Sequence, residues 1–232
     1  KEFHKKYYHP SNSYIYLYGN MDMAEQLDFI DKEYLSQFDV REVNSEVTIQ
    51  PAFTETKRIV KEYPIGAEDK EEDNAYFAYN MAVADPLDKE LNIAFQIIDY
   101  ALCSAAGAPL KQALLDAGLG TEVYSRYDNG IKQPMFSIVS KNIDASKEAQ
   151  FLDTIYKVLT EVVEKGFDKK ALCAALNSYE FKYREADFGR YPKGLMYGLQ
   201  MLDSWLYDDR KPFIHIEAGD TYQLLRSKVD TD

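Results

Sequence analysis

Hydrophobic residues recur along this chain with two periods, one typical of strands and one typical of helices. Residues 13–18 alternate three tyrosines with Ile15 and Leu17, and this period of two predicts a strand with both faces covered. A helix is predicted to follow, because Asp22 can cap it and apolar residues recur after it at intervals of three and four. Residues 1–38 therefore combine one strand with one amphipathic helix, which is too little to form a domain alone.

A change of composition divides this first segment from the rest of the chain. Residues 39–56 are polar and aperiodic, and they are predicted to form a linker. Residues 57–232 then provide an ordinary domain length. Near the start of this domain, 57–63 and 75–83 are predicted strands, and the charged run 68–73 between them is predicted to be a solvated turn.

A hairpin and several helices are predicted in the remainder. Strands are expected at 121–127 and 135–141, joined through Asn129-Gly130, a pair that favours the positive φ of a tight connection. Helices are predicted from Asp85-Pro86 to Leu102, over 110–117, from Phe151 to Gly166, from Asp168 to Tyr183, and over 195–207. This order predicts an α+β fold in which a mixed, mainly antiparallel sheet packs against several helices.

Composition and charge narrow the classes of partner. Of the 232 residues, 46% are hydrophobic and 28% charged, which is typical of a soluble globular protein. The net charge of −12 repels phosphate backbones, so nucleic acid is not an expected partner. The apolar runs are shorter than the roughly 18 to 20 residues that span a bilayer, so we expect no membrane partner either. The chain begins at Lys1 without a signal peptide, and we expect a piece of a longer, cytoplasmic protein.

Few residues of this chain have the pattern of a metal-binding or catalytic site. The three histidines, His4, His9 and His215, lack the spacing of metal ligands, so no metal site is predicted. No phosphate-binding loop and no serine elbow occurs, so no catalytic residue is predicted. Cys103 and Cys173 lie within apolar helical patterns, where we expect buried free thiols, with a single disulfide as the alternative.

Several motifs resemble one family. Residues 3–12, Phe-His-Lys-Lys-Tyr-Tyr-His-Pro-Ser-Asn, and 14–20, Tyr-Ile-Tyr-Leu-Tyr-Gly-Asn, resemble the end of the first domain in the pitrilysin/insulinase zinc metallopeptidases, especially the presequence-protease subfamily. Residues 107–110, 117–121 and 163–167 resemble successive landmarks of the second domain. The resemblance therefore implies the end of domain one followed by the non-catalytic second domain.

The resemblance also implies a function for the longer protein. In that family a helix with the pattern H-x-x-E-H and a downstream glutamate of the first domain hold zinc, and this chain reproduces neither. It implies that the parent is a zinc-dependent metalloendopeptidase that degrades unfolded peptides in an enclosed chamber. Zinc would belong to the parent, and this piece would be inactive, supplying chamber wall and substrate binding. The alternative is a non-catalytic scaffold or assembly homologue of the same fold.

A substrate-binding strand is the one site that the resemblance implies within this chain. In relatives an edge strand of domain two pairs with the peptide away from the zinc. The corresponding residues here are Val123, Tyr124, Ser125, Arg126 and Tyr127. The implied partners are extended or unfolded peptides and the remaining domains of the parent, and the net charge of −12 would attract basic peptides.

Overall fold

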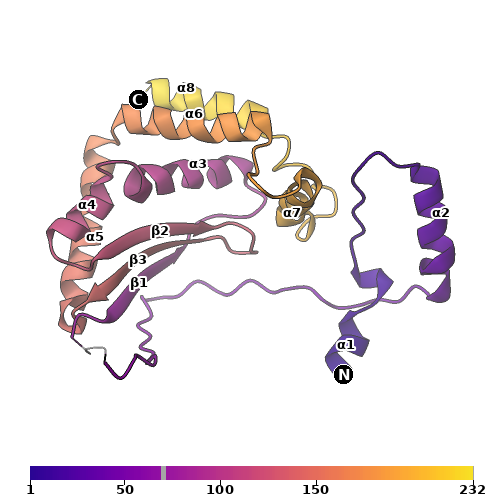
Figure 1. Ribbon diagram of the computed structural model, residues 1–232, viewed down its shortest axis with the longest axis horizontal. Helices are drawn as coiled ribbons and strands as arrows, with labels where there is room; N and C mark the ends of the chain where they lie inside the picture. Colours follow the sequence, from indigo (N-terminus) through magenta and orange to yellow (C-terminus); the bar gives the residue numbers. More distant parts are fainter. Residues whose placement is uncertain (69–71, 232) are drawn as a thin grey trace.

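A three-stranded sheet covered on one side by helices forms the body of the protein, and the N-terminal residues extend away from it (Figure 1). The computed structural model describes residues 1–68 and 72–231, so part of the charged run predicted as a turn lies outside the described residues. The strands are β1 (Ala75–Ala82), β2 (Glu122–Asp128) and β3 (Met135–Ile143). The helices are α1 (Glu2–Tyr7), α2 (Met23–Glu33), α3 (Lys89–Asp99), α4 (Pro109–Asp116), α5 (Glu148–Lys165), α6 (Lys169–Glu185), α7 (Lys193–Trp205) and α8 (Gly219–Thr231), with a π-helical turn, η3 (Tyr100–Ser104), after α3.

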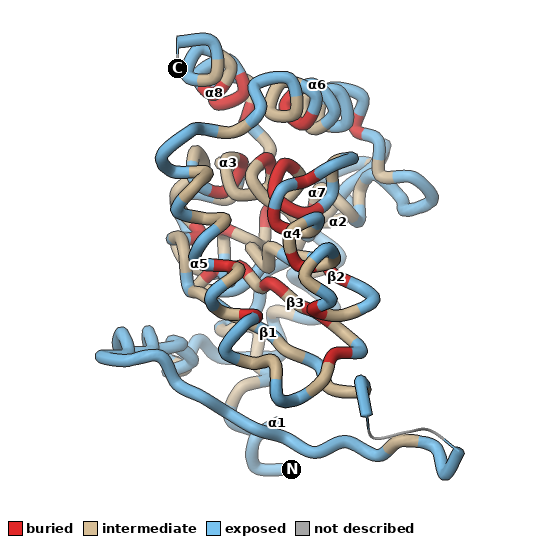
Figure 2. Tube along the Cα trace, turned by 90° about the vertical axis from the view of Figure 1, so that its left-hand side faces the viewer, coloured by how far each residue is buried: buried red, intermediate tan, exposed pale blue. Residues whose placement is uncertain are grey.

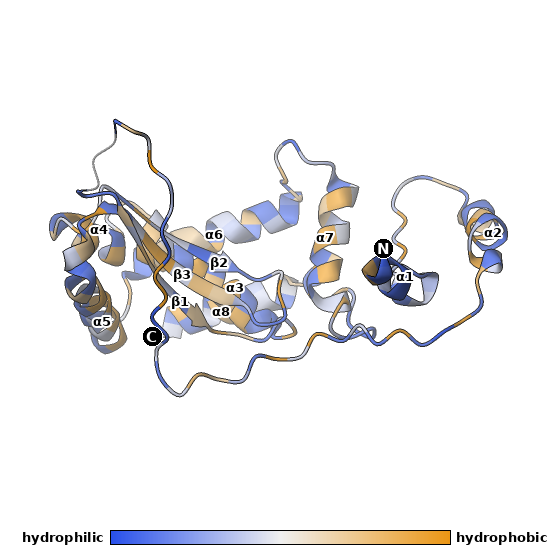
Figure 3. Ribbon diagram, turned by 90° about the horizontal axis from the view of Figure 1, so that it is seen from below, coloured by the Kyte–Doolittle hydropathy of each residue, from blue (hydrophilic) through white to orange (hydrophobic). Residues whose placement is uncertain are grey.

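The sheet has the order β1-β3-β2, and both pairs are antiparallel. Ile138 at the centre of β3 lies opposite Tyr79 of β1 and Ser125 of β2. Successive side chains of a strand point to opposite faces, and accordingly Phe136 and Ile138 are buried beneath the helices. Seen from below, the apolar strands lie in front of the helices that cover them (Figure 3). The α+β architecture expected from the sequence is confirmed.

Two hydrophobic clusters hold these layers together. The first joins the inner face of the sheet to α4, α5 and η3, with Phe136, Ile138 and Phe151 fully buried in it. The second joins α3 to α6 and α8 through Ile93, Leu176 and neighbouring residues. Because α3 lies between the sheet and the α6–α8 pair, it carries apolar residues on two faces (Figures 1 and 2).

Residues 89–116 form the one described helical stretch that is long and apolar enough to cross a membrane, judged by length and composition alone. Ile93 and Ile97 pack in the second cluster, and Leu102 and Leu110 pack in the first. Burial against protein on two sides produces the same hydropathy as burial in lipid, since both environments exclude water. The hydropathy of this stretch therefore follows from its central position in the fold.

Helix ends are where sequence and structure agree best. The Asp22 carboxylate accepts hydrogen bonds from the backbone N–H groups of Ala24, at 2.9 Å, and Glu25, at 3.2 Å, and α2 begins there as predicted. The Asp168 side chain likewise caps α6. Gly166 ends α5 with a φ of +77°, a conformation that costs glycine little.

Two predicted strands are wrong in this structure. Residues 13–18 and 57–63 have extended or irregular backbone, and neither pairs with a strand of the described chain. The second segment instead runs beneath β1 (Figure 1), held by an ion pair of 2.7 Å between Arg58 and Glu148. Alternation of side chains produces a strand only when a neighbouring strand offers backbone partners, and alternation in sequence does not report that partner.

The predicted start of α3 and the predicted hairpin turn also need correction. The Asp85 carboxylate accepts from the Leu87 N–H in an isolated turn, whereas Asp88 caps the helix. The predicted hairpin strands do pair, but the connection spans 129–134, and neither Asn129 nor Gly130 has positive φ. Helix α8, which completes the second cluster, has no counterpart among the predicted elements.

Candidate functional site

Strand β2 is the last strand on one side of the sheet, so one of its backbone edges faces away from β3. Two bonds at the strand ends fix which residues face which way. The Val83 N–H donates to the Pro134 carbonyl, at 3.0 Å, and the Thr121 N–H donates to the Lys141 carbonyl, at 2.9 Å. Hydrogen-bonded pairs alternate in an antiparallel ladder, so even-numbered residues of β3 bond to β1 and odd-numbered residues bond to β2.

This alternation divides the residues of the predicted binding strand into those whose backbone groups bond to β3 and those whose backbone groups face away from it. Tyr124 and Arg126 lie opposite odd-numbered residues of β3 and therefore bond to β3. Val123, Ser125 and Tyr127 turn their N–H and C=O groups to the outer edge. Among the described residues no further strand lies along that edge. Outward backbone groups of this kind are what an added extended chain would bond.

Only part of the outer edge is open. Val123 is 2% exposed because it packs in the first cluster beside α4 and η3. Ser125 and Tyr127 are half-buried, so the C-terminal half of the edge is more exposed than the part around Val123. The candidate edge is therefore shorter than the five residues that the resemblance implies.

The side chains of these two residues face the helical layer. The Tyr127 ring stacks on Phe95, with ring centroids 5.5 Å apart, and burial together with the charge of Asp88 raises the pKa of its hydroxyl to about 12. Ser125 lies beside Cys103, and burial raises the pKa of that thiol to about 11. A thiol of this pKa remains protonated near neutral pH, so Cys103 has the properties of a core residue and not of a nucleophile. Both cysteines are unpaired.

Tyr124 lies on the opposite, solvent-facing side of the sheet. The Lys141 ammonium lies 5.0 Å from the Tyr124 ring centroid and 3.1 Å from a Glu122 carboxylate oxygen. The hydrogen bond to Glu122 raises the pKa of Lys141. Nearby, Arg126 forms an exposed ion pair of 3.3 Å with Asp128. This side of β2 is thus a polar and aromatic surface with its charges already paired.

The three histidines are engaged elsewhere and do not converge. The His9 Nδ1 accepts a hydrogen bond from the Ser11 N–H, at 3.2 Å, and His4 stacks on Tyr8. The His215 Nε2 lies 2.8 Å from the Pro86 carbonyl oxygen and donates to it. Across residues 1–68 and 72–231, no three or more metal-ligating side chains lie close enough to hold a metal ion. These residues therefore do not fit the zinc that the resemblance implies for the parent.

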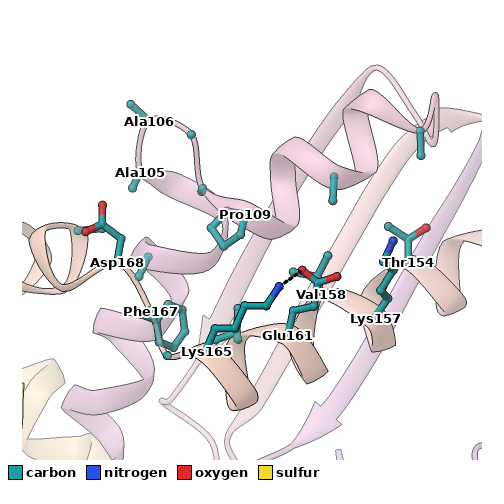
Figure 4. Close-up of a pocket in the computed structure, with 18 residues that line it drawn as sticks. Ala105, Ala106, Pro109, Thr154, Lys157, Val158, Glu161, Lys165, Phe167 and Asp168 are labelled. Atoms are coloured by element: carbon teal, nitrogen blue, oxygen red, sulfur yellow. Dashed lines mark hydrogen bonds and ion pairs between the residues drawn. The ribbon is translucent and has the colours of Figure 1, made fainter. Parts of the chain in front are cut away.

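One cavity, of about 610 Å³, lies on the helical side between η3, α4, α5 and α6 (Figure 4). Small residues such as Ala105 and Ala106 line it, and three of its charged groups are engaged with other groups. Lys165 pairs with Glu161 at 3.4 Å, and the Asp168 carboxylate caps α6. The cavity contains no residue of the candidate edge.

A second cavity, of about 440 Å³, exposes a group that the sequence reasoning missed. Asp203 of α7 lines it together with Asn92 and His215. Burial, and then the negative charge of Asp128, raise the pKa of Asp203 to about 6. The sequence signal for it is the single carboxylate of α7, a helix whose residues are mostly apolar.

We expect Asp203→Asn to stabilise the protein at pH 7 by about 1 kcal/mol, because the amide removes a partly buried charge. A raised folded-state pKa means that ionisation disfavours the folded state. This cost is absent below about pH 4, grows up to pH 6 and is complete above it. Urea unfolding at pH 7 and pH 4 measures the difference. Asp153→Asn, on the exposed surface of α5, is the control, and an equal effect of both variants at both pH values would contradict the expectation.

Comparison with known sequences assigns the family. The family model described as the peptidase M16 inactive domain matches residues 1–179. The chain belongs to the peptidase M16 family. Members are zinc metallopeptidases, and this part of the M16 chain is a non-catalytic domain of the family.

Relatives cover the whole chain at moderate identity. The M16 chain is 41% identical over 231 residues to protein HypA of Clostridium perfringens, and 31% identical over 233 residues to presequence protease 1, chloroplastic/mitochondrial, of Arabidopsis thaliana. These alignments cover 100% and 99% of this chain but 24% and 21% of the relatives. The chain therefore spans about a quarter of the length of these relatives. One of these relatives is named a chloroplastic/mitochondrial protein and the other comes from a bacterium, so the cytoplasmic location of this chain stays a prediction.

A solved structure supports the fold. The inactive peptidase domain of a zinc protease candidate from Bordetella parapertussis superimposes with a TM-score of 0.53 at 14% identity. The match covers 67% of this chain and 80% of that one. At this identity the likeness establishes the architecture alone.

Proposed function

We propose that this chain is a wall and substrate-holding part of a longer M16 zinc metalloendopeptidase that degrades extended or unfolded peptides in a chamber. The single observation that carries the proposal is the outer edge of β2, where Ser125 and Tyr127 direct backbone groups away from β3 and no strand of residues 1–68 or 72–231 pairs with them. The zinc site and the catalytic groups would lie in other parts of the parent. The chain alone is expected to hold no zinc and to cleave no peptide.

We also propose that the chain contains the end of one domain of this longer peptidase and the whole of the next. Residues 1–38, with the extended segment 13–18 and helix α2, would be the end of the catalytic-type first domain, 39–56 the linker, and 57–232 the second domain. The exposed apolar residues Met23, at 46%, and Leu27, at 56%, support this division, because they lie four residues apart on one face of α2, and such a face normally packs against further protein.

Strand addition suits a peptidase of unfolded chains. Backbone hydrogen bonds hold any extended peptide with little dependence on its sequence, and alternate side chains supply selectivity. The net charge of −12 supports a preference for basic peptides, since it raises their local concentration. Folded proteins would be rejected because their backbone groups are already paired.

The alternative function is a non-catalytic scaffold or assembly subunit of the same fold. The upstream reading frame of the parent separates the two. An H-x-x-E-H helix with a downstream glutamate supports the peptidase, and its absence supports the scaffold.

The test of the binding edge is Ser125→Pro in the full-length parent. Proline removes the outward N–H of Ser125 and leaves the bonds between Tyr124, Arg126 and β3 in place. We expect the KM for a long peptide to rise about tenfold, equivalent to about 1.4 kcal/mol, with kcat little changed. A short peptide that reaches only the zinc cleft should be cleaved as before.

Ser125→Ala is the matched control, because it removes the hydroxyl and keeps the N–H. It should retain the KM of the unmodified protein. If Ser125→Pro folds normally by circular dichroism and binds long peptides unchanged, the edge has a structural role only and the site assignment fails.

A further inference from the structure

Three tyrosines of the extended segment 13–18 pack along one face of α7. The ring centroids of Tyr14 and Trp205 lie 4.6 Å apart, and the Tyr14 hydroxyl donates a hydrogen bond of 2.8 Å to the Asp209 carboxylate. Tyr16 and Tyr18 continue the row toward the N-terminus of the helix. The segment passes beside α7 on its way from α1 to α2 (Figure 1).

Two glycines of α7 make room for this row. A Cβ atom on Gly198 would lie 2.9 Å from Cδ1 of Tyr16, closer than side chains tolerate. On Gly194 it would collide with Cδ1 of Tyr18 and lie 2.8 Å from Cγ. Neither glycine has positive φ, so the backbone conformation does not require glycine at either position.

The spacing of the tyrosines along segment 13–18 matches the spacing of the glycines along α7. Alternate residues of an extended chain are about 6.6 Å apart, and residues four apart on a helix are about 6 Å apart. Tyr18 and Tyr16 therefore meet Gly194 and Gly198 in order, and Tyr14 reaches Trp205 further along. Glycine inside a helix lowers its stability relative to alanine. Two glycines on one face are thus a cost that the ring packing offsets.

The opposite side of α7 contacts the loop after β2. The Tyr207 hydroxyl, just beyond the helix, lies 3.5 Å from the Gly130 carbonyl oxygen, and a Cβ on Gly130 would lie 3.2 Å from Asp203. Helix α7 thus stands between the N-terminal segment and the sheet hairpin.

We propose that Tyr14, Tyr16 and Tyr18, which pack on the side of α7 that carries Gly194 and Gly198, form a joint. This joint holds the N-terminal segment, residues 1–38, in a fixed place on the M16 inactive domain. The partner that this face of α7 fits is an extended chain with aromatic residues at every second position. Partial burial, with the hydrogen bond and charge of Asp209, raises the pKa of Tyr14 to about 12, in keeping with a ring held in place. The joint does not depend on peptide binding at β2.

Trp205 is the single tryptophan of the chain, and its fluorescence therefore reports the joint directly. We expect Gly198→Ala to displace Tyr16, loosen the row, shift Trp205 emission to the red and raise its quenching by acrylamide. Tyr14→Ala should expose Trp205 in the same way without altering α7. Leu199→Ala, at a position of α7 that is 47% exposed, is the control and should leave both signals unchanged.

The sign of the stability change on Gly198→Ala shows whether this face of α7 packs against the tyrosines or is an ordinary exposed helix surface. Without the joint, Gly198→Ala would stabilise α7 and raise the melting temperature, with unchanged Trp205 emission, and that result would overturn the proposal. With the joint, Gly198→Ala is destabilising in the native background and becomes stabilising once Tyr16→Ala has removed the ring. If Tyr14→Ala leaves Trp205 as protected as before, the row is not docked and the proposal also fails.

Discussion

Gly120→Ala is expected to destabilise the protein by about 4 kcal/mol, because it combines backbone strain with a collision in the core. Gly120 has a φ of +106°, a conformation that side chains disfavour. The new Cβ would meet the Ser140 hydroxyl and lie 2.7 Å from the Lys141 carbonyl oxygen. That hydroxyl donates to the Leu119 carbonyl in the buried entry to β2, so the collision would disturb the strand that carries the candidate edge.

Gly107→Ala is the matched control for this effect. Gly107 also has positive φ, at +70°, but apart from its chain neighbours no described residue has an atom within 4 Å of the position of its Cβ. It should cost only about 1 kcal/mol, from the backbone conformation alone. Urea unfolding of both variants measures the difference, and equal losses would show that packing around Gly120 contributes nothing.

Phe151→Ala should cost about 4 kcal/mol, because it opens a cavity where α5 meets the sheet. Phe151 is 2% exposed, and its ring centroid lies 5.5 Å from that of Phe77 in β1. Phe181→Ala is the control, since its ring on α6 is 61% exposed, and we expect a change of at most about 0.5 kcal/mol. Thermal unfolding of the two variants tests the assignment of the core. A loss for Phe181→Ala as large as that for Phe151→Ala would contradict it.

Local features were predictable because their causes lie within a few residues. Asp22 and Asp168 cap helices through their own side chains, and Gly166 ends a helix through its own φ. Periodicity likewise located α5, whose buried Phe151 and Ile155 share one face.

Features that depend on distant partners could not be predicted in this way. Asp85 and Asp88 both have the chemistry of a helix cap, and only the packing of α3 between the sheet and the α6–α8 pair selects the second. Which part of the β2 edge is more exposed could not be predicted from the sequence either, since contact with α4 and η3 buries Val123, whereas Ser125 and Tyr127 are only half-buried.

The sequence by itself determined the helix caps at Asp22 and Asp168, the amphipathic faces, the hairpin pairing and the α+β class, because short-range chemistry and side-chain period specify them. Only the tertiary structure decided whether an alternating segment becomes a strand. Residues 13–18 alternate as regularly as a strand requires, yet their tyrosines pack on the glycine face of α7 and not beside another strand. The reason is physical: a strand is completed by the backbone groups of a neighbour, and the neighbour is chosen by the fold as a whole.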